Sequence, residues 1–330
     1  MMNFCTLFDS YYIHKGIALY LSLEKVTENF HLYVMAFDKK CYDRLQNYGF
    51  KHMTVELVDN FETPELLDVK ATRTKAEYCW TCGPSVIYYF INRYNLCSLT
   101  YLDADLYFMN SPQVLFDEID KNSVALSEHF LDEESPEGGK YCVQFVYFKN
   151  DVDGIAALKW WRDSCIDWCY SRYEDGKYGD QKYLDYIPER FSNVYIIKNR
   201  GCGVAPWNMK KYKYFSNGEL EYNNIRYPII FFHMHGTSIC MKNNVLSLKT
   251  ITYDIDNLQK EHFFLPYLEL LRSIYKQFFN ITIKQIKIKD RPISQQLYSK
   301  LKSKFRKNGL ARWFYYDVLK VRYNGYESKK

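Results

Sequence analysis

The chain has 330 residues, of which 47% are hydrophobic, 25% are charged and 18% are aromatic. These proportions exclude a disordered chain, and no segment reaches the roughly 18 apolar residues that a membrane helix needs. A chain of this length can bury a sizeable core, as one large domain or as a domain with an appendage. The many Tyr, Phe and Trp residues suit a well-filled core, or a surface that binds sugars or bases.

The first half of the chain alternates strand-like apolar runs with helical patterns, as successive βαβ units do. Strands are predicted over residues 3–8, 31–37, 53–58, 98–102, 123–127, 141–148, 193–197 and 229–233. Helices are predicted over roughly residues 15–25, 75–95 and 154–172. We therefore expect an α/β domain with a mixed sheet over residues 1–252.

The pattern changes near residue 253, where helical periodicity replaces the alternation. One helix is predicted over residues 256–279. Another is predicted to begin at Pro292, because apolar residues then recur at four-residue spacing, at Ile293, Leu297, Leu301 and Phe305. We therefore expect a helical, basic C-terminal region over residues 253–330.

Charge is spread unevenly along the chain. The net charge is +5 overall, yet residues 282–330 carry +11 and the remainder carries −6. A basic tail on an acidic body indicates an anionic partner, either a membrane surface or nucleic acid. Because the basic residues are confined to the end, we favour peripheral attachment to an anionic membrane and expect no nucleic acid. A solvated helical face is the remaining alternative.

The expected location follows from the first residues and from the cysteines. The N-terminus has no basic region followed by an apolar run, so no signal peptide is predicted. We expect a cytoplasmic protein, peripheral at the inner membrane face if the tail binds lipid. The ten cysteines should then be reduced and mostly buried. For Cys79-x-x-Cys82, core packing is favoured over a redox or zinc role.

Two aspartates follow the predicted strand 98–102. They form the segment Asp103-Ala104-Asp105, after which a second apolar run begins at once. Alternate residues of an extended chain point the same way, and ligands of open α/β sheets bind at the carboxyl ends of strands. Both carboxylates can therefore face one site, where they suit Mn²⁺ or Mg²⁺ bridging to phosphates. The alternative is a polar strand end that caps a turn.

His233 ends another apolar run, which would bring it to the same edge of the sheet as the aspartates. An imidazole beside carboxylates is a suitable ligand set for Mn²⁺. We therefore predict Asp103, Asp105 and His233 as metal ligands. His235 lies on the same face of an extended chain and competes with His233 for this role.

The segment Tyr101-Leu102-Asp103-Ala104-Asp105 resembles the Asp-x-Asp motif of GT-A-type glycosyltransferases, in a form close to that of glycosyltransferase family 8. Further resemblances follow in the family's order over about residues 1–240, at segments 4–9, 141–145, 179–181 and 232–236. Residues 201–208 (GCGVAPWN) resemble a segment of proteins grouped as nucleotide-diphospho-sugar transferases of bacterial polysaccharide clusters.

The resemblance implies a GT-A-like, Rossmann-like mixed sheet flanked by helices. It also implies metal-dependent, retaining transfer of a sugar, hexosyltransferase-like, from a nucleotide diphosphate donor to a hydroxyl acceptor. A UDP-sugar is the favoured donor, and the acceptor would be a glycan or a lipid-linked sugar of surface polysaccharide or lipopolysaccharide synthesis.

The resemblance also assigns roles to individual residues. Thr6, Phe8 and Asp9 would hold the nucleotide, Asp103 would contact both donor and metal, and Gln144 would meet the donor sugar and acceptor. Asp180 and Gln181 would lie beside the transferring sugar as the catalytic pair, and His233 would be the third metal ligand. As an alternative, Asp180 follows Gly179 at a position where it could cap a helix.

Two parts of the family pattern differ in this chain. The lysine expected after His-x-x-Gly is displaced to Lys242, without the Pro-Trp that usually follows it. The arginine expected before the metal motif has no direct counterpart, and we predict Arg73, or Lys75, for its role. An inverting enzyme would need a general base, which Glu128 or Asp180 could supply.

Two rival functions were weighed against sugar transfer. A sugar nucleotidyltransferase also uses such a sheet and a divalent metal, but the chain has no Gly-rich, basic phosphate loop after the first predicted strand. A nucleic-acid-binding protein would act through the basic tail. Both functions stay as alternatives to sugar transfer.

Overall fold

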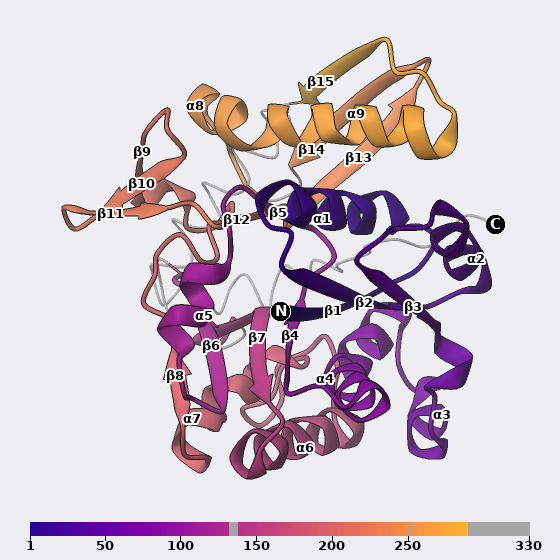
Figure 1. The fold of residues 1–330 in the computed structure, drawn as a ribbon, viewed down its shortest axis with the longest axis vertical. Helices are drawn as coiled ribbons and strands as arrows, with labels where there is room; N and C mark the ends of the chain where they lie inside the picture. Colours follow the sequence, from indigo (N-terminus) through magenta and orange to yellow (C-terminus); the bar gives the residue numbers. More distant parts are fainter. Residues whose placement is uncertain (132–137, 251–252, 290–330) are drawn as a thin grey trace, which may run out of the picture.

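The computed structural model describes residues 1–131, 138–250 and 253–289. Its centre is a seven-stranded sheet in the order β3-β2-β1-β4-β7-β6-β8 (Figure 1). The strands are β1 (Met2–Phe8), β2 (Phe30–Ala36), β3 (Met53–Leu57), β4 (Ser98–Leu102), β6 (Val124–Glu128), β7 (Tyr141–Lys149) and β8 (Val194–Ile196). The first four in chain order pair in parallel, while β7 runs antiparallel to both β4 and β6.

Seven of the predicted strands form this central sheet, each within about two residues of its expected ends. The eighth, predicted over residues 229–233, is the shorter β12 (Phe231–His233) and lies outside it. It pairs antiparallel with β5 (Leu106–Phe108), the apolar run that follows the two aspartates. Three short strands form a separate sheet: β9 (Lys213–Tyr214), β10 (Glu219–Tyr222) and β11 (Ile225–Pro228).

Helices cover both faces of the central sheet (Figure 1). On one face lies α1 (Ile13–Val26), and on the other lie α4 (Lys75–Tyr94) and α6 (Val152–Asp167). Neighbouring residues of β1 serve the two cores, with Phe4 on the α1 side and Cys5 on the α4 side, as the strand period requires. The other short helices are α2 (Lys39–Tyr48), α3 (Pro64–Lys70), α5 (Gln113–Ile119) and α7 (Ile187–Arg190).

The helices α4 and α6 differ in how closely they match their predicted lengths. α4 has the predicted length and begins with a capping box in which Thr74 and Glu77 bond to each other's backbone N–H. α6 is shorter than the predicted helix over residues 154–172. Trp168 adopts an extended backbone, and its carbonyl accepts a hydrogen bond from the Tyr183 hydroxyl at 2.8 Å, so the chain turns away before residue 172.

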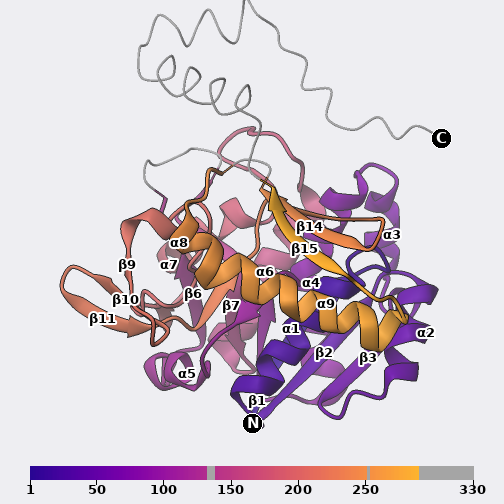
Figure 2. The same ribbon diagram turned by 90° about the horizontal axis from the view of Figure 1, so that it is seen from above.

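The helix predicted over residues 256–279 is present as a continuous run of α8 (Asn257–Gln259), a π-helical turn (Lys260–Phe264) and α9 (Leu265–Phe279). The π turn lies just before Pro266, which has no N–H for a regular helical bond. α9 packs against α1 and lies across it in the view from above (Figure 2). Within the described ranges, no helix is long and apolar enough to cross a bilayer.

One strand of the C-terminal region was not predicted. β15 (Gln285–Lys289) pairs in parallel with β14 (Val245–Thr250), which pairs antiparallel with β13 (Thr237–Lys242). The sequence QIKIK alternates apolar and charged residues, which is the period of a strand rather than of a helix. The helix predicted from Pro292 lies outside the described residues, and the domain boundary at residue 252 stays a prediction.

All ten cysteines lie in described segments and are free thiols. Cys82 lies on the buried face of α4 and is 0% exposed. Burial raises the pKa of Cys79 to about 11, which opposes the thiolate that redox or zinc chemistry requires. These observations favour core packing for the Cys79-x-x-Cys82 pair.

Candidate active site

The two aspartates occupy a short turn between β4 and β5, at the carboxyl end of β4. The backbone N–H of Asp103 donates to the carbonyl of Gln144 on β7 at 3.2 Å. The carbonyl of Asp105 accepts from the N–H of Met234 at 2.9 Å. The turn is therefore tied to the central sheet on one side and to the end of β12 on the other, which holds both carboxylates at one edge of the sheet.

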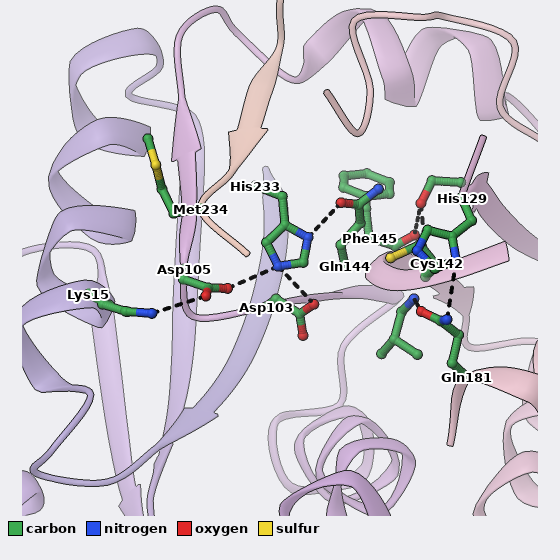
Figure 3. A network of polar contacts seen from close by, with 12 residues as sticks. Lys15, Asp103, Asp105, His129, Cys142, Gln144, Phe145, Gln181, His233 and Met234 are labelled. Carbon is green, nitrogen blue, oxygen red and sulfur yellow. Dashed lines mark hydrogen bonds and ion pairs between the residues drawn. The ribbon is translucent and has the colours of Figure 1, made fainter. Parts of the chain in front are cut away.

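His233 is the last residue of β12 and is 4% exposed. Its Nε2 atom lies 3.1 Å from Oδ1 of Asp105 and 3.7 Å from Oδ2 of Asp103 (Figure 3). Its Nδ1 atom lies 2.9 Å from Oε1 of Gln144. The structure thus brings together the three side chains that the sequence predicted as metal ligands.

His235 is placed differently. Its ring lies edge-on to those of Trp207 and His233, with centroids 5.2 and 5.4 Å away, and the residue is exposed. In the described part of the chain it makes no ion pair with either aspartate, whereas His233 makes one with each. The geometry favours His233 over its competitor.

Opposing effects set the charges of this cluster. Burial raises the pKa of Asp103 to about 6, a rise that His233 opposes and Asp105 reinforces. Burial would also raise the pKa of Asp105, but Lys15 and His233 outweigh it and hold that pKa well below its ordinary value. Burial lowers the pKa of His233, and the two carboxylates more than compensate, so the net shift is upward. Asp105 is therefore ionised at neutral pH.

Lys15 is a site residue that the sequence interpretation missed. It lies on α1, is 5% exposed, and its Nζ atom is 3.2 Å from Oδ2 of Asp105. The ammonium also lies 4.4 Å from the centre of the Tyr12 ring. A signal was present, because Lys15 is the only Asp, Glu, Lys or Arg between Asp9 and Glu24, in an otherwise apolar helix.

A cavity of about 440 Å³ opens beside this cluster. Its lining includes Asp103 and His233, the predicted catalytic pair, and four large aromatic side chains, Trp80, Tyr178, Trp207 and Tyr253. Flat aromatic faces with polar tips suit the binding of a sugar ring. The cavity therefore joins the predicted metal ligands and the predicted catalytic residues in one site.

Asp180 and Gln181 face this cavity from the start of a 3-10 helix (Gln181–Tyr186). Asp180 makes no side-chain capping bond, so the capping role considered for it is not seen. Burial, reinforced by the charge of Asp103, raises the pKa of Asp180 to about 7. The Gln181 amide accepts from the N–H of Val143 at 3.4 Å and donates to the carbonyl of Gly138, which fixes its orientation.

The residues predicted to hold the nucleotide fall into two groups. Thr6 and Phe8 are 0% and 3% exposed, so their side chains belong to the core beneath the loop. Asp9 reaches the loop surface, where it accepts the N–H groups of Tyr11 and Tyr12 at 3.0 Å and pairs with Lys75. Of these three predicted residues, only Asp9 has its side chain at the loop rather than in the core.

Arg73 lies away from the cavity. Its guanidinium donates to the carbonyl of Ile166 at 3.1 Å and lies 3.9 Å from the centre of the Tyr170 ring. The last carbonyls of a helix lack intrahelical partners, and this arginine serves the end of α6. The structure therefore does not bring Arg73 to the site, whereas Lys75, the alternative, lies at the loop through its pair with Asp9.

Three other residues considered from the sequence lie outside the cavity lining. Lys242 ends β13 and is exposed. Glu128, one of two candidates for a general base, pairs with Arg200 at 2.5 Å. Gln144, expected to meet the donor, is fully buried behind His233.

The side chains of Asp103, Asp105 and His233 fit a divalent metal, because two carboxylates and an imidazole are ligands that Mn²⁺ prefers. Among the described residues, no group of three or more His, Cys, Asp and Glu side chains is already spaced to hold a metal ion. Asp105 and His233 instead contact each other directly, with Lys15 supplying a positive charge on the far side of Asp105. A metal ion would have to displace the contact between the imidazole and the carboxylate.

The fold is that of a known class of enzymes. It is similar to the galactosyltransferase LgtC in complex with donor and acceptor sugar analogs, with a TM-score of 0.51 and 13% identity over 82% of this chain and 96% of that chain. It is also similar to the apo form of the glycosyltransferase GlyE of Streptococcus pneumoniae TIGR4, with a TM-score of 0.50 and 10% identity over 84% and 63%. The chain therefore has the GT-A glycosyltransferase fold.

Closer relatives are found by sequence. The uncharacterized proteins YfnD and YfnF of Bacillus subtilis (strain 168) are 31% and 30% identical to this chain over 247 and 261 residues. These matches cover 72% and 76% of this chain, and 78% and 86% of the relatives. The chain belongs to the family that includes YfnD and YfnF. No model of a known protein family matches it.

Proposed function

We propose that this protein is a metal-dependent glycosyltransferase that moves a sugar from a nucleotide diphosphate donor, with a UDP-sugar favoured, to a hydroxyl acceptor. One observation carries the proposal: Asp103, Asp105 and His233 meet at the carboxyl edge of a GT-A sheet, beside an aromatic-lined cavity. Polar groups that converge on a cavity at this edge are typical of a ligand site. The sequence resemblance to family 8 adds the expectation of a retaining reaction.

The three side chains would hold Mn²⁺ or Mg²⁺. A metal bound there supplies Lewis-acid stabilisation of the charge that develops on the departing diphosphate. Side chains of the protein bind the sugar and the nucleoside. Trp80 and Trp207 offer flat faces to the sugar ring, Asp180 and Gln181 flank it, and Asp9 meets the nucleoside from the loop after β1.

A screen of nucleotide sugars by thermal unfolding tests the proposal. We expect one donor to raise the melting temperature in Mn²⁺ and to lose that effect in EDTA, because ligands that bind only the folded state stabilise it by mass action. Nucleoside monophosphates and free sugars serve as controls. Stabilisation by no nucleotide sugar, or equal stabilisation with and without metal, would contradict the proposal.

His233→Ala is expected to weaken Mn²⁺ binding by about tenfold or more, and His235→Ala should weaken it much less. The reason is that His233 alone of the two lies within ion-pair distance of both aspartates. Mn²⁺ affinity can be measured by electron paramagnetic resonance of the free ion. The opposite ranking would assign the role to His235.

The basic tail supports a second part of the proposal, a peripheral position at the inner membrane face near a lipid-linked acceptor. Residues 290–330 carry a net charge of +8, and they lie outside the described residues, so the argument here is from sequence. Each Lys or Arg near an anionic lipid surface contributes on the order of 1 kcal/mol, and salt screens that attraction.

A chain ending at Lys289 keeps β15 and removes the tail. We expect it to retain Mn²⁺-dependent donor binding and to lose co-sedimentation with phosphatidylserine vesicles, which high salt should also weaken for the full chain. A full-length control with Lys300, Lys302 and Lys304 changed to Gln should bind vesicles less tightly. Equal binding by the shortened chain, or none by the full chain, would remove the membrane role.

A further inference from the structure

The imidazole of His233 is held on the side that faces away from the aspartates. Its Nδ1 atom lies 2.9 Å from Oε1 of Gln144 (Figure 3). The Trp207 ring stands edge-on to the imidazole, with centroids 5.3 Å apart. Its backbone N–H donates to the carbonyl of Val204 at 2.8 Å. Two of these three contacts come from residues 201–208, the GCGVAPWN motif, in which only Trp207 has a role in the proposed chemistry so far.

Gln144 contacts both halves of the site. Its backbone carbonyl accepts from the N–H of Asp103 at 3.2 Å, while its side chain meets His233. The residue is 0% exposed on a central strand, and its Nε2 atom has no hydrogen-bond partner among the described residues. Burying a half-satisfied amide costs free energy, so stability alone does not explain a glutamine at this position.

Gly203 makes room for that amide. It has a φ of +86°, and a Cβ atom added there would lie 2.3 Å from Nε2 of Gln144. A side chain at residue 203 would therefore be strained by the backbone and would collide with the glutamine. Asn208 closes the loop around this glycine, since its side chain accepts from the N–H of Ala205 and donates to the carbonyl of Gly203, both at 2.9 Å.

We infer that Gln144 is a positioning residue for His233. Residues 203–208 hold the loop that leaves room for the Gln144 side chain. The Gln144 carbonyl accepts the Nδ1–H of the imidazole and so directs Nε2 toward Asp103 and Asp105. A metal-ligating histidine commonly donates its other ring N–H to a fixed acceptor, which sets the tautomer and the ring orientation. The inference rests on the proposed function only in assigning His233 as a metal ligand.

The test compares substitutions of one buried glutamine that remove or keep its hydrogen-bond acceptor. Gln144→Met keeps the length of the side chain and removes the acceptor, whereas Gln144→Glu keeps an acceptor. Gln259→Met is the matched control, because Gln259 is also buried, at 2% exposed, but caps α8. Each full chain, with ¹⁵N-labelled histidine, is examined without metal by NMR for the Nδ1–H of His233, and then for Mn²⁺ affinity.

We expect Gln144→Met to lose the protected Nδ1–H signal and to bind Mn²⁺ about 10- to 100-fold more weakly. Gln144→Glu and Gln259→Met should keep both properties close to wild type. Gly203→Ala displaces the Gln144 amide without removing it, and it should lose the Nδ1–H signal as Gln144→Met does. If Gln144→Met does not fold, Gly203→Ala tests whether Gln144 positions His233.

Three results would overturn the inference. They are an unchanged signal and affinity in Gln144→Met, an equal loss in the Met and Glu variants, and a wild-type His233 without a protonated Nδ1. If the wild type binds no Mn²⁺, the proposed function fails. The NMR comparison still decides the role of Gln144 in that case, because it is made without metal.

Discussion

Asp105→Asn is expected to lower the rate of sugar transfer by about 100- to 1000-fold while the fold is kept. Asparagine preserves the shape of the side chain and can still form a hydrogen bond. It lacks the negative charge that attracts a divalent cation and that balances Lys15 and His233 at 3.2 and 3.1 Å. Steady-state rates with a nucleotide sugar and Mn²⁺ give the effect, and circular dichroism reports the fold.

The choice of asparagine over alanine follows from Lys15. An alanine at residue 105 would leave the buried ammonium with neither a carboxylate nor a hydrogen-bond acceptor, so loss of activity could then reflect unfolding, whereas the asparagine carbonyl can still accept from Lys15. Asp117→Asn is the control, since Asp117 is exposed on α5 and accepts a hydrogen bond from the exposed Gln113 one turn away. Full activity of Asp105→Asn in Mn²⁺ would exclude Asp105 as a required metal ligand.

Lys15→Met is expected to lower the free energy of unfolding by about 3–5 kcal/mol, because it leaves the buried carboxylate of Asp105 without the Lys15 ammonium that balances its charge. The side chains of Lys15 and Asp105 are only 6% and 14% exposed. Burial lowers the pKa of Lys15, but Asp105 more than compensates, so the lysine is charged at neutral pH. Urea unfolding at pH 7 measures the change.

A surface pair provides the matched control. Lys39 and Asp43 also form an ion pair, but their side chains are 68% and 49% exposed, so Lys39→Met should change stability by less than about 1 kcal/mol. Combining Lys15→Met with Asp105→Asn should cost less than the sum of the two single changes, because each removes the charge that the other leaves unpaired. Strict additivity, or a loss for Lys15→Met no larger than for the control, would contradict the account.

The Asp-x-Asp segment could be recognised from sequence because its signal is local. An apolar strand that ends in two alternate carboxylates specifies both their common direction and their position at a sheet edge. His233 was predicted for the same reason, since it ends an apolar run. The choice between His233 and His235 needed the structure, because β12 ends at His233 and the chain turns at Gly236, where φ is +64°.

Residues brought in by packing could not be predicted in this way. Lys15 meets Asp105 across 90 positions of sequence, through the packing of α1 against β5. Arg73 was predicted as a counterpart of the family's arginine before the metal motif, but the carbonyls at the end of α6 hold it. Gln144 was expected to face the donor because β7 does, whereas its side chain points to the buried side of His233.

For the strands too, local sequence could predict individual elements, whereas their arrangement depends on contacts between distant residues. The existence of the seven central strands followed from runs of apolar residues, yet their order β3-β2-β1-β4-β7-β6-β8 depends on crossovers that no local pattern encodes. β15 was missed because its five residues lie in a lysine-rich segment after a long helix. Its partner, β14, begins 40 positions earlier in the chain.

The central claim is that this site transfers sugar with the help of a metal held by Asp103, Asp105 and His233. The most direct measurement is the release of nucleoside diphosphate from the donor that stabilises the protein most, by wild type in Mn²⁺, in EDTA, and after Mn²⁺ is restored. We predict release in Mn²⁺, its loss in EDTA, and its full recovery, with Asp105→Asn inactive throughout. Release that continues unchanged in EDTA, or that Asp105→Asn supports as well as wild type, would contradict the claim.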